Sequence, residues 1–264
     1  MIYFTNKNSL IIHAENLFMA TKIARSVLLT LSLLPALAMA SHWSYEGEGA
    51  PEHWGELAPD FSLCQKGMNQ SPIDIDNTLK AHVVPLKTHY VDGPSLILNN
   101  GHTVQATLPE TTQDSVTIDG VAYRLQQFHF HAPSENTLHG KHYDLEMHLV
   151  HKNAAGELAV VAVMFKTGAA NAELEKLWQA LPEHTDASQP LTTAIDINKL
   201  LPQDKTYYRF SGPLTTPPCS EGIAWLVVKH PLTLSAAQLD KFKQLMHHDN
   251  NRPVQPLHGR VVVE

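Results

Sequence analysis

Cysteine, long apolar runs and basic clusters are all scarce in this chain of 264 residues. The two cysteines, Cys64 and Cys219, lack the C-x-x-C spacing of cysteine-based structural zinc sites. The formal net charge is −7 and no basic run occurs outside the N-terminal region, so nucleic acid is not expected as a partner. No internal repeat or low-complexity tract divides the sequence, and a β-rich chain of this length commonly forms one domain.

The N-terminal region has the pattern of an export signal. A short basic stretch, Met19–Arg25, precedes an apolar run from Val27 to Leu37, and Ala38-Met39-Ala40 fits the small-x-small cleavage rule. The run is too short for a stable membrane span, although a buried core helix is an alternative. We predict a signal peptide within residues 1–40, with an upstream extension if Met19 is the true start, and a mature domain at 41–264. The predicted location is the periplasm or the extracellular space.

The cysteine pair fits such a compartment. In an oxidising environment an even number of cysteines indicates a disulfide, so Cys64 and Cys219 are predicted to pair. The bridge would close a loop of about 155 residues, for which chain entropy gives at most roughly 5 kcal/mol. Two free buried thiols are the alternative.

Short alternating segments follow residue 83 and predict a mostly β fold. Strands are expected at 86–91, 95–99, 103–108, 115–118, 121–131, 145–150, 158–166, 207–210, 223–229 and 261–263, with a first short strand at 71–75. The segment at 158–166 is apolar almost throughout, which is typical of a strand buried on both faces. Only two helices are indicated, at 171–178 and 235–246, with Asn171 and Ser235 as their N-caps. Residues 41–72 are irregular and rich in aromatic residues, and we expect an arm that packs on this body.

Alternating polar and aromatic residues place two histidines on one side of a strand. Because side chains alternate along a strand, Gln127, His129 and His131 point to one face. Phe128 and Phe130 point to the other face. Two imidazoles spaced in this way can converge on one metal ion.

A second alternating strand supplies a third histidine. Glu146, His148 and Val150 share a face, so His148 can add a nitrogen if the two strands are neighbours. Three histidines with an open fourth position describe a catalytic zinc site. Gln127 and Glu146 offer oxygen acceptors for the second N–H of ligating histidines. A single strand histidine is more often a packed core residue, but three inward histidines without a metal would be costly to bury.

Five segments, in order, resemble the α-class carbonic anhydrases, and the short link Ala132–Glu135 together with the cysteine pair resembles their bacterial exported branch. These segments are Leu98–His102, Gln127–His131, Glu146–His151, Leu214–Cys219 and Asn251–Pro256. The resemblance covers nearly all of the predicted mature chain. It implies a single, mainly β domain with a central twisted, mostly antiparallel sheet of about ten strands, a few peripheral helices and a conical cleft. It also implies reversible hydration of carbon dioxide to bicarbonate and a proton.

The resemblance makes His129, His131 and His148 the ligands of a catalytic Zn²⁺, as the strand faces also predict. Zinc lowers the pKa of bound water to about 7, which makes zinc-bound hydroxide available to attack CO₂; carbonic anhydrase is itself the reference case for this effect. Thr215 would accept a hydrogen bond from the hydroxide and donate its own to Glu135. This direction follows because an ionised carboxylate can only accept.

Further positions match the substrate site of this family. Thr216 matches a bicarbonate contact, and an apolar wall for CO₂ is implied for a second set of residues. That set is Val150, Val160, Leu214 and Trp225. Core packing is the alternative for Val160 and Trp225, since both lie in runs that any β protein would bury.

The proton path depends most heavily on the resemblance. His102 matches a histidine that relays protons to buffer, and Tyr45 and Asn100 match residues that order the intervening water. An exposed bystander is the alternative for a histidine in a turn. Gln105 and Asn136 depart from the vertebrate pattern, and Gln105 bears on the efficiency of the proton path. Histidines outside the motifs are expected at the surface, with only adventitious metal binding: His139, His142, His247 and His248.

Three other functions stay open at this point. A catalytically silent binding module could use the same fold, although such proteins usually lose a zinc histidine. A zinc hydrolase acting on esters or peptides would normally need a carboxylate base such as that of H-E-x-x-H, which is absent. A periplasmic zinc carrier would hold its metal weakly. The sequence leaves both a monomer and a homodimer open.

Overall fold

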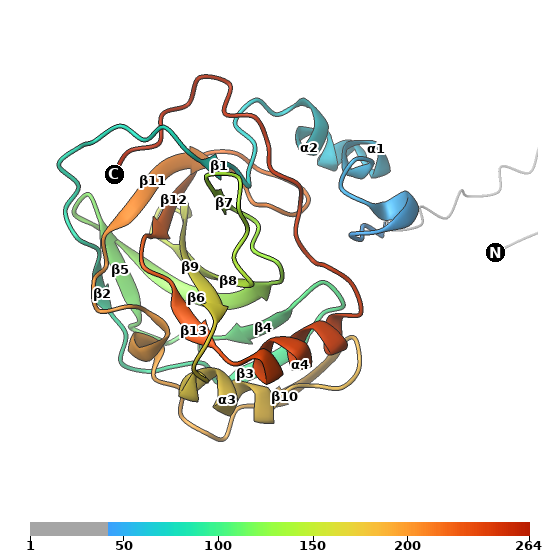
Figure 1. The fold of residues 1–264 in the computed structure, drawn as a ribbon, viewed down its shortest axis with the longest axis vertical. Coiled ribbons are helices and arrows are strands. Elements are labelled where there is room, and N and C mark those ends of the chain that lie inside the picture. Colours follow the sequence, from blue (N-terminus) through green and yellow to red (C-terminus); the bar gives the residue numbers. More distant parts are fainter. Residues whose placement is uncertain (1–41) are drawn as a thin grey trace, which may run out of the picture. The chain divides into compact units, whose positions relative to one another are not determined.

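The computed structural model describes residues 42–264, so the predicted signal peptide lies outside the described residues. A sheet of 11 strands dominates this part of the chain (Figure 1). Its strands are β2 (Lys87–His89), β3 (Leu96–Asn99), β4 (Val104–Thr107), β5 (Ser115–Ile118), β6 (Val121–His131), β8 (Leu145–Lys152), β9 (Leu158–Thr167), β10 (Ala187–Pro190), β11 (Tyr207–Gly212), β12 (Ile223–Val228) and β13 (Leu232–Leu234). The spatial order is β10-β3-β4-β6-β8-β9-β12-β11, with β13 also paired to β9, and with β5 joining β2 to β6. All pairs are antiparallel except those of β12 and β13 with β9, which confirms the expected mostly antiparallel sheet.

Helices are few and short, as the sequence predicts. They are α1 (Trp54–Leu57), α2 (Leu63–Lys66), α3 (Ala172–Gln179) and α4 (Ala236–Met246), with 3₁₀ turns η1 (Gly47–Gly49), η2 (Pro59–Phe61) and η3 (Ile197–Leu200). The side chain of Asn171 accepts from two backbone N–H groups of α3. Ser235 and Gln238 form a capping box at the start of α4. Both predicted N-caps are therefore confirmed.

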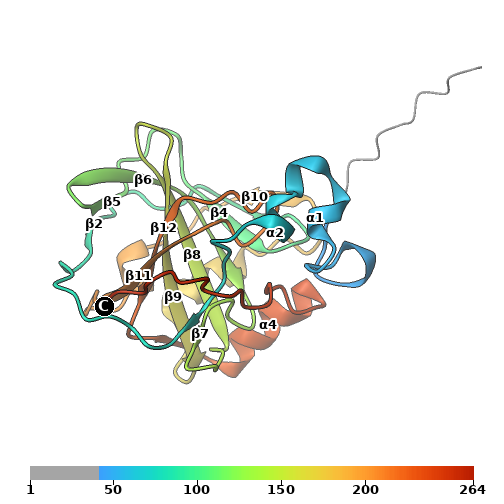
Figure 2. The same cartoon turned by 90° about the horizontal axis from the view of Figure 1, so that it is seen from above.

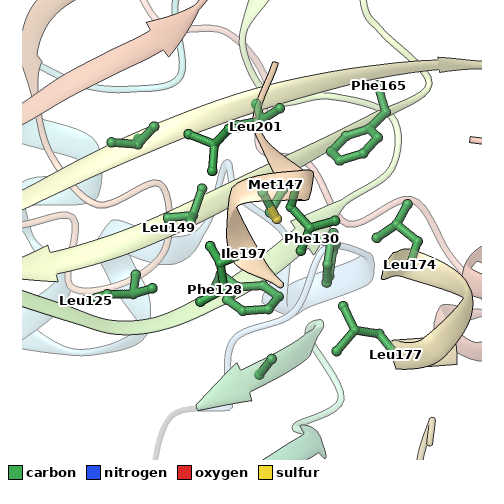
Figure 3. Packing of buried hydrophobic residues seen from close by; sticks show 14 of the residues in the cluster. Leu125, Phe128, Phe130, Met147, Leu149, Phe165, Leu174, Leu177, Ile197 and Leu201 are labelled. Atoms are coloured by element: carbon green, nitrogen blue, oxygen red, sulfur yellow. The ribbon is translucent and has the colours of Figure 1, made fainter. Parts of the chain in front are cut away.

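One face of the sheet carries the main hydrophobic core. Phe128 and Phe130 of β6 and Met147 and Leu149 of β8 are fully buried in one cluster with side chains of α3, α4 and η3 (Figure 3). The burial of Phe128 and Phe130 on this face confirms the period-two alternation predicted for the strand. A β-bulge between Leu125 and Gln127 adds a residue to β6. As a result the remainder of β6 shifts by one residue, and Leu125 joins the phenylalanines in the core.

The N-terminal arm packs onto the domain through one tryptophan and one arginine. Trp54 is fully buried, and its indole N–H donates to the carbonyls of Ser44 and Gly49 at 2.9 and 2.8 Å. The Arg252 guanidinium lies 5.5 Å from the Trp54 ring and donates to the Cys64 carbonyl at 2.8 Å. The segment after α4 therefore passes beside α2 (Figure 2). These contacts confirm that the arm docks on the body.

Cys64 of α2 and Cys219 form the predicted disulfide, with their Cα atoms 5.0 Å apart. Both side chains lie in a small cluster with Tyr45 and Trp54. The bridge thus ties the arm to the loop after β11. Within residues 42–264, no helix has the length and apolarity needed to cross a membrane.

Several elements differ from the sequence prediction, among them the short helices α1 and α2 in the arm that was expected to be irregular. The expected strand at 261–263 is wrong, because Val263 forms only isolated bridges to Leu79 and Arg209. The short strands β10 and β13 were not predicted, and neither was β7 (Thr137–Leu138), which pairs in parallel with β1 (Asp74–Ile75). These strands are two to four residues long, too short to show a period.

Candidate active site

The three predicted histidines converge at the centre of the sheet. β6 and β8 are neighbours, and His129 lies directly opposite His148 in their antiparallel register. One ligand nitrogen from each of His129, His131 and His148 lies within 4.8 Å of the other two. His131 and His148 are each 1% exposed, whereas His129 is half-buried and gives solvent access to the cluster.

Each imidazole has an oxygen within about 3 Å of one ring nitrogen. Gln127 Oε1 lies 2.8 Å from Nδ1 of His129, and Glu146 Oε1 lies 3.0 Å from Nε2 of His148. The backbone carbonyl of Asn250 lies 2.7 Å from Nδ1 of His131. Gln127 and Glu146 lie on the same strand faces as the histidines, as the alternation predicted. The role of Asn250 could not be predicted, because a backbone carbonyl acts whatever the identity of its residue.

Glu146 is itself held in place by three donors. The backbone N–H groups of Glu135 and Asn136 donate to Oε2 at 2.7 and 2.8 Å, and the Asn136 amide donates to Oε1 at 2.7 Å. Asn136 also accepts from the backbone of Ile73. The departure from the vertebrate pattern at Asn136 therefore supplies a donor that positions the acceptor of His148.

The electrostatics of the cluster suit a cation bound by neutral imidazoles. Burial, followed by the neighbouring His131 and His148, lowers the pKa of His129 well below its ordinary value. Burial is also the main cause that lowers the pKa of His131 and of His148. Among the described residues, no hydrogen-bond partner reaches the buried Nε2 of His131. A buried, unpartnered nitrogen is costly unless something binds it, and metal ligands must be deprotonated, so these residues fit a divalent metal.

A buried carboxylate stands beside the cluster. Glu135 Oε2 lies 3.6 Å from Nε2 of His131 and 3.9 Å from Nδ1 of His148. Its Oε1 accepts from the backbone N–H of Arg252 at 2.9 Å. Burial raises the pKa of Glu135 to about 8, while hydrogen bonds from the Arg252 backbone and the Thr215 side chain act to lower it. A bound divalent cation would favour the ionised form further.

The loop that carries Thr215 is fixed at its end. Thr215 is 4% exposed and Thr216 is half-buried. The Thr216 carbonyl accepts from the backbone N–H of Cys219 at 2.9 Å, and Cys219 is bridged to Cys64. The disulfide therefore closes the loop close to both threonines.

The four residues predicted for an apolar wall share one cluster on the histidine face. Val150 lies opposite Gln127 on β6 and opposite Val160 on β9. Val160 lies in turn opposite Trp225 on β12, and Leu214 packs against the same cluster. Three of the four thus form one cross-strand row, next to the row that holds His129.

His102 lies in a turn built by Asn100. The Asn100 side-chain oxygen accepts from the backbone N–H groups of His102 and Thr103 at 3.0 and 2.9 Å, so this oxygen shapes the turn. The half-buried His102 ring stacks on Trp43 at a centroid distance of 3.7 Å. Burial is the main cause that lowers the pKa of His102, and the nearby His42 and His248 add to the effect.

Tyr45 lies deeper than the turn of His102. Its side chain is 9% exposed, and its buried hydroxyl has no hydrogen-bond partner among the described residues. Burial, followed by the charge of Glu135, raises the pKa of Tyr45 well above its ordinary value.

Three of the four histidines expected at the surface are exposed: His139, His142 and His247. His248 differs, because it is half-buried and its ring lies 5.9 Å from that of Tyr45.

Comparison with known proteins agrees with this geometry. Residues 49–264 match the family model of eukaryotic-type carbonic anhydrases. A carbonic anhydrase of Klebsiella pneumoniae is 64% identical over 246 residues, which cover 93% of this chain and 100% of the relative. An α-carbonic anhydrase from Thermovibrio ammonificans, solved with the inhibitor sulfanilamide, has a TM-score of 0.83 at 48% identity, over 85% of this chain and 99% of that one. One from Photobacterium profundum has a TM-score of 0.80 at 48% identity, over 84% and 100%.

The chain therefore belongs to the eukaryotic-type carbonic anhydrase family. Members of this family are lyases that hydrate carbon dioxide, and the enzyme class predicted from the sequence is confirmed.

Proposed function

We propose that this enzyme catalyses the zinc-dependent, reversible hydration of CO₂ to bicarbonate and a proton. The observation that carries the proposal is the cluster of three imidazole nitrogens within 4.8 Å of one another. His129, His131 and His148 would hold the zinc, with their outer nitrogens directed to Gln127, Asn250 and Glu146. Three nitrogen ligands with an open fourth position are typical of catalytic zinc. When bound, the zinc would lower the pKa of a coordinated water to about 7, a property for which this family is the reference case.

Thr215 and Glu135 would orient the attacking group. A hydrogen bond between them would have one possible direction of donation, because an ionised Glu135 can only accept and Thr215 must donate. The Thr215 oxygen is then left as an acceptor only. An attacking O–H group can therefore donate to Thr215 in just one orientation, which aims its lone pair at the substrate. Thr216, on the same loop, would contact bicarbonate.

The apolar row would receive CO₂. Because CO₂ carries no net charge, it offers no partner for an ion pair. Val150, Val160 and Trp225 would bind it by dispersion and exclude water. Leu214 would complete the wall. The Trp225 ring lies 4.9 Å from that of His148, which places this wall beside the metal ligands.

His102 would take the proton released by each turnover. A half-buried imidazole can accept a proton near neutral pH and pass it to buffer. Tyr45 and Asn100 would order the intervening water. The side-chain oxygen of Asn100 already accepts hydrogen bonds within the turn. Asn100 would therefore order water through its side-chain N–H₂ group.

The disulfide supports export to an oxidising compartment. Cys64 and Cys219 are paired, and such bridges persist mainly in periplasmic or extracellular proteins. We therefore place the mature protein there, with residues 1–40 as the cleaved signal.

The deciding experiment is stopped-flow CO₂ hydration with a pH indicator. The zinc-loaded protein should accelerate hydration far above buffer, whereas chelator-treated protein and a His148→Ala variant should not. Metal analysis of the same samples should give one zinc per chain for the wild type and none for the variant. A zinc-loaded protein no faster than buffer would sink this proposal and favour a silent binding module.

A further inference from the structure

His248 is a histidine beside Tyr45 that the proposed chemistry leaves without a role. It lies two residues after the end of α4 and is half-buried against the ring of Tyr45. Its Nδ1 lies 3.0 Å from the carbonyl of Asp249. A carbonyl can only accept, so Nδ1 carries the proton and Nε2 is the basic nitrogen.

Asn250 fastens the loop of His248 to the turn of His102. Its side-chain N–H₂ group donates to the carbonyls of His102 and Phe130, both at 2.9 Å. Its side-chain oxygen accepts from the backbone N–H of Ala132 at 2.8 Å. Because both segments are tied to the end of β6, His102 and His248 are held in a fixed relation to each other and to the metal ligands.

The charge of His248 also acts on the His102 imidazole. The charge of His248 acts to lower the pKa of His102, as does that of His42, whose ring lies 5.8 Å away. Asp186 acts in the opposite direction. His248 itself is flanked by Tyr45, His247 and Asp249.

We propose that His248 is a second proton acceptor of this active site, working beside His102. The inference rests on the proposed function, since an acceptor is needed only where each turnover releases a proton. An O–H bond of a site water breaks as an N–H bond forms at Nε2, and the imidazolium then gives a proton to a buffer base. Because a charge on one imidazole disfavours a charge on the other, the two would be used alternately.

A titration tests the coupling without any catalytic readout. In zinc-loaded protein, NMR of the histidine ring protons should show that His248→Gln raises the pKa of His102 by a few tenths of a unit. His247→Asn is the matched control, because this exposed neighbour has the left-handed backbone that asparagine tolerates, and it should leave His102 unchanged. An unchanged His102 in the His248→Gln variant would overturn the coupling.

Turnover in dilute buffer tests the proton transfer itself. The kcat of a His102→Ala/His248→Gln double variant should fall about threefold or more below that of His102→Ala alone, and added imidazole should restore both. The kcat/KM for CO₂ should stay constant, since proton removal follows the CO₂ step. If the double variant matches His102→Ala, His248 carries no protons, although the proposed function stands. If the wild type itself hydrates no CO₂, the proposed function fails first.

Discussion

At the scale of the residue, the site depends on side chains that never meet the substrate. Gln127 and Glu146 orient two of the histidines, and Asn250 orients the third through its backbone. Such partners fix the ring orientation and the tautomer of a ligand, and their loss typically costs about 10- to 100-fold in metal affinity.

Gln127→Ala should weaken zinc binding by about 10- to 100-fold, because His129 loses its only acceptor among the described residues. Competition with a chromogenic chelator measures this affinity. The control is Gln126→Ala, at the bulge, whose side chain donates to the Arg124 carbonyl instead and should bind zinc normally. Equal affinities of the two variants would contradict the role of Gln127.

The site shows where residue-level prediction succeeds and where it stops. Period two placed His129 and His131 on one face of β6 and gave the face of His148 on β8, while the pairing of the two strands is known from the structure. Neither the Asn250 carbonyl nor the Arg252 N–H at Glu135 could be predicted, because backbone groups leave no trace in residue identity. His248 was expected at the surface, since nothing in its neighbours reveals the fold around Tyr45.

At the scale of the element, β8 carries a second histidine, with a different role. His151 is fully buried, and its Nε2 lies 2.8 Å from the Tyr90 hydroxyl. Burial lowers the pKa of His151 to about 3. The unfolded chain therefore takes up this proton first as the pH falls below about 6.5, and stability is lost between that value and the folded pKa.

The free energy of unfolding of zinc-free protein should fall with pH by up to about 1.4 kcal/mol per unit from this one residue. In His151→Gln that part of the slope between pH 6 and pH 4 should vanish. Urea unfolding at several pH values measures it, with the exposed His82→Gln as the control. An identical slope in wild type and His151→Gln would show that other groups account for the acid sensitivity.

The junction of α3 and α4 depends on one glutamine. Gln238 Oε1 accepts from the backbone N–H groups of Ser235 and Asn171, and its amide donates to the Asn171 carbonyl. Gln238→Ala should lower the free energy of unfolding by about 1–3 kcal/mol, because it leaves partly buried backbone groups at both helix starts without this partner. Gln244→Ala, exposed on the same helix, should change it little. Thermal or urea unfolding compares the two.

At the scale of the whole molecule, the disulfide is the main long-range tie. It joins residues 155 apart in sequence and brings the arm to the loop of Thr215. Cys64→Ala/Cys219→Ala should lower the free energy of unfolding by about 2–5 kcal/mol. Reductant should cause a similar loss in the wild type and none in the variant, and a large effect on the variant would point to another cause.

The fold class and the single large sheet follow from alternation repeated along the sequence. The prediction errors lie in the shortest elements, whose conformation is determined by tertiary contacts. β10 forms because Ala187–Pro190 lies against β3, and Val263 stays a bridge although its neighbours are β-branched. No period can build up over so few residues.

The position of the histidines within the strand order has a further consequence. β6 and β8 have neighbours on both sides, while β10 and β11 lie at the ends of the order. Local opening in native proteins begins at frayed edges and spreads inward only at a higher free energy. Amide hydrogens of β6 and β8 should therefore exchange with solvent among the last in the molecule. In a form with open edge strands, β6 and β8 would stay paired and the three histidines would keep their positions. A bound metal would therefore be retained through such opening and closing.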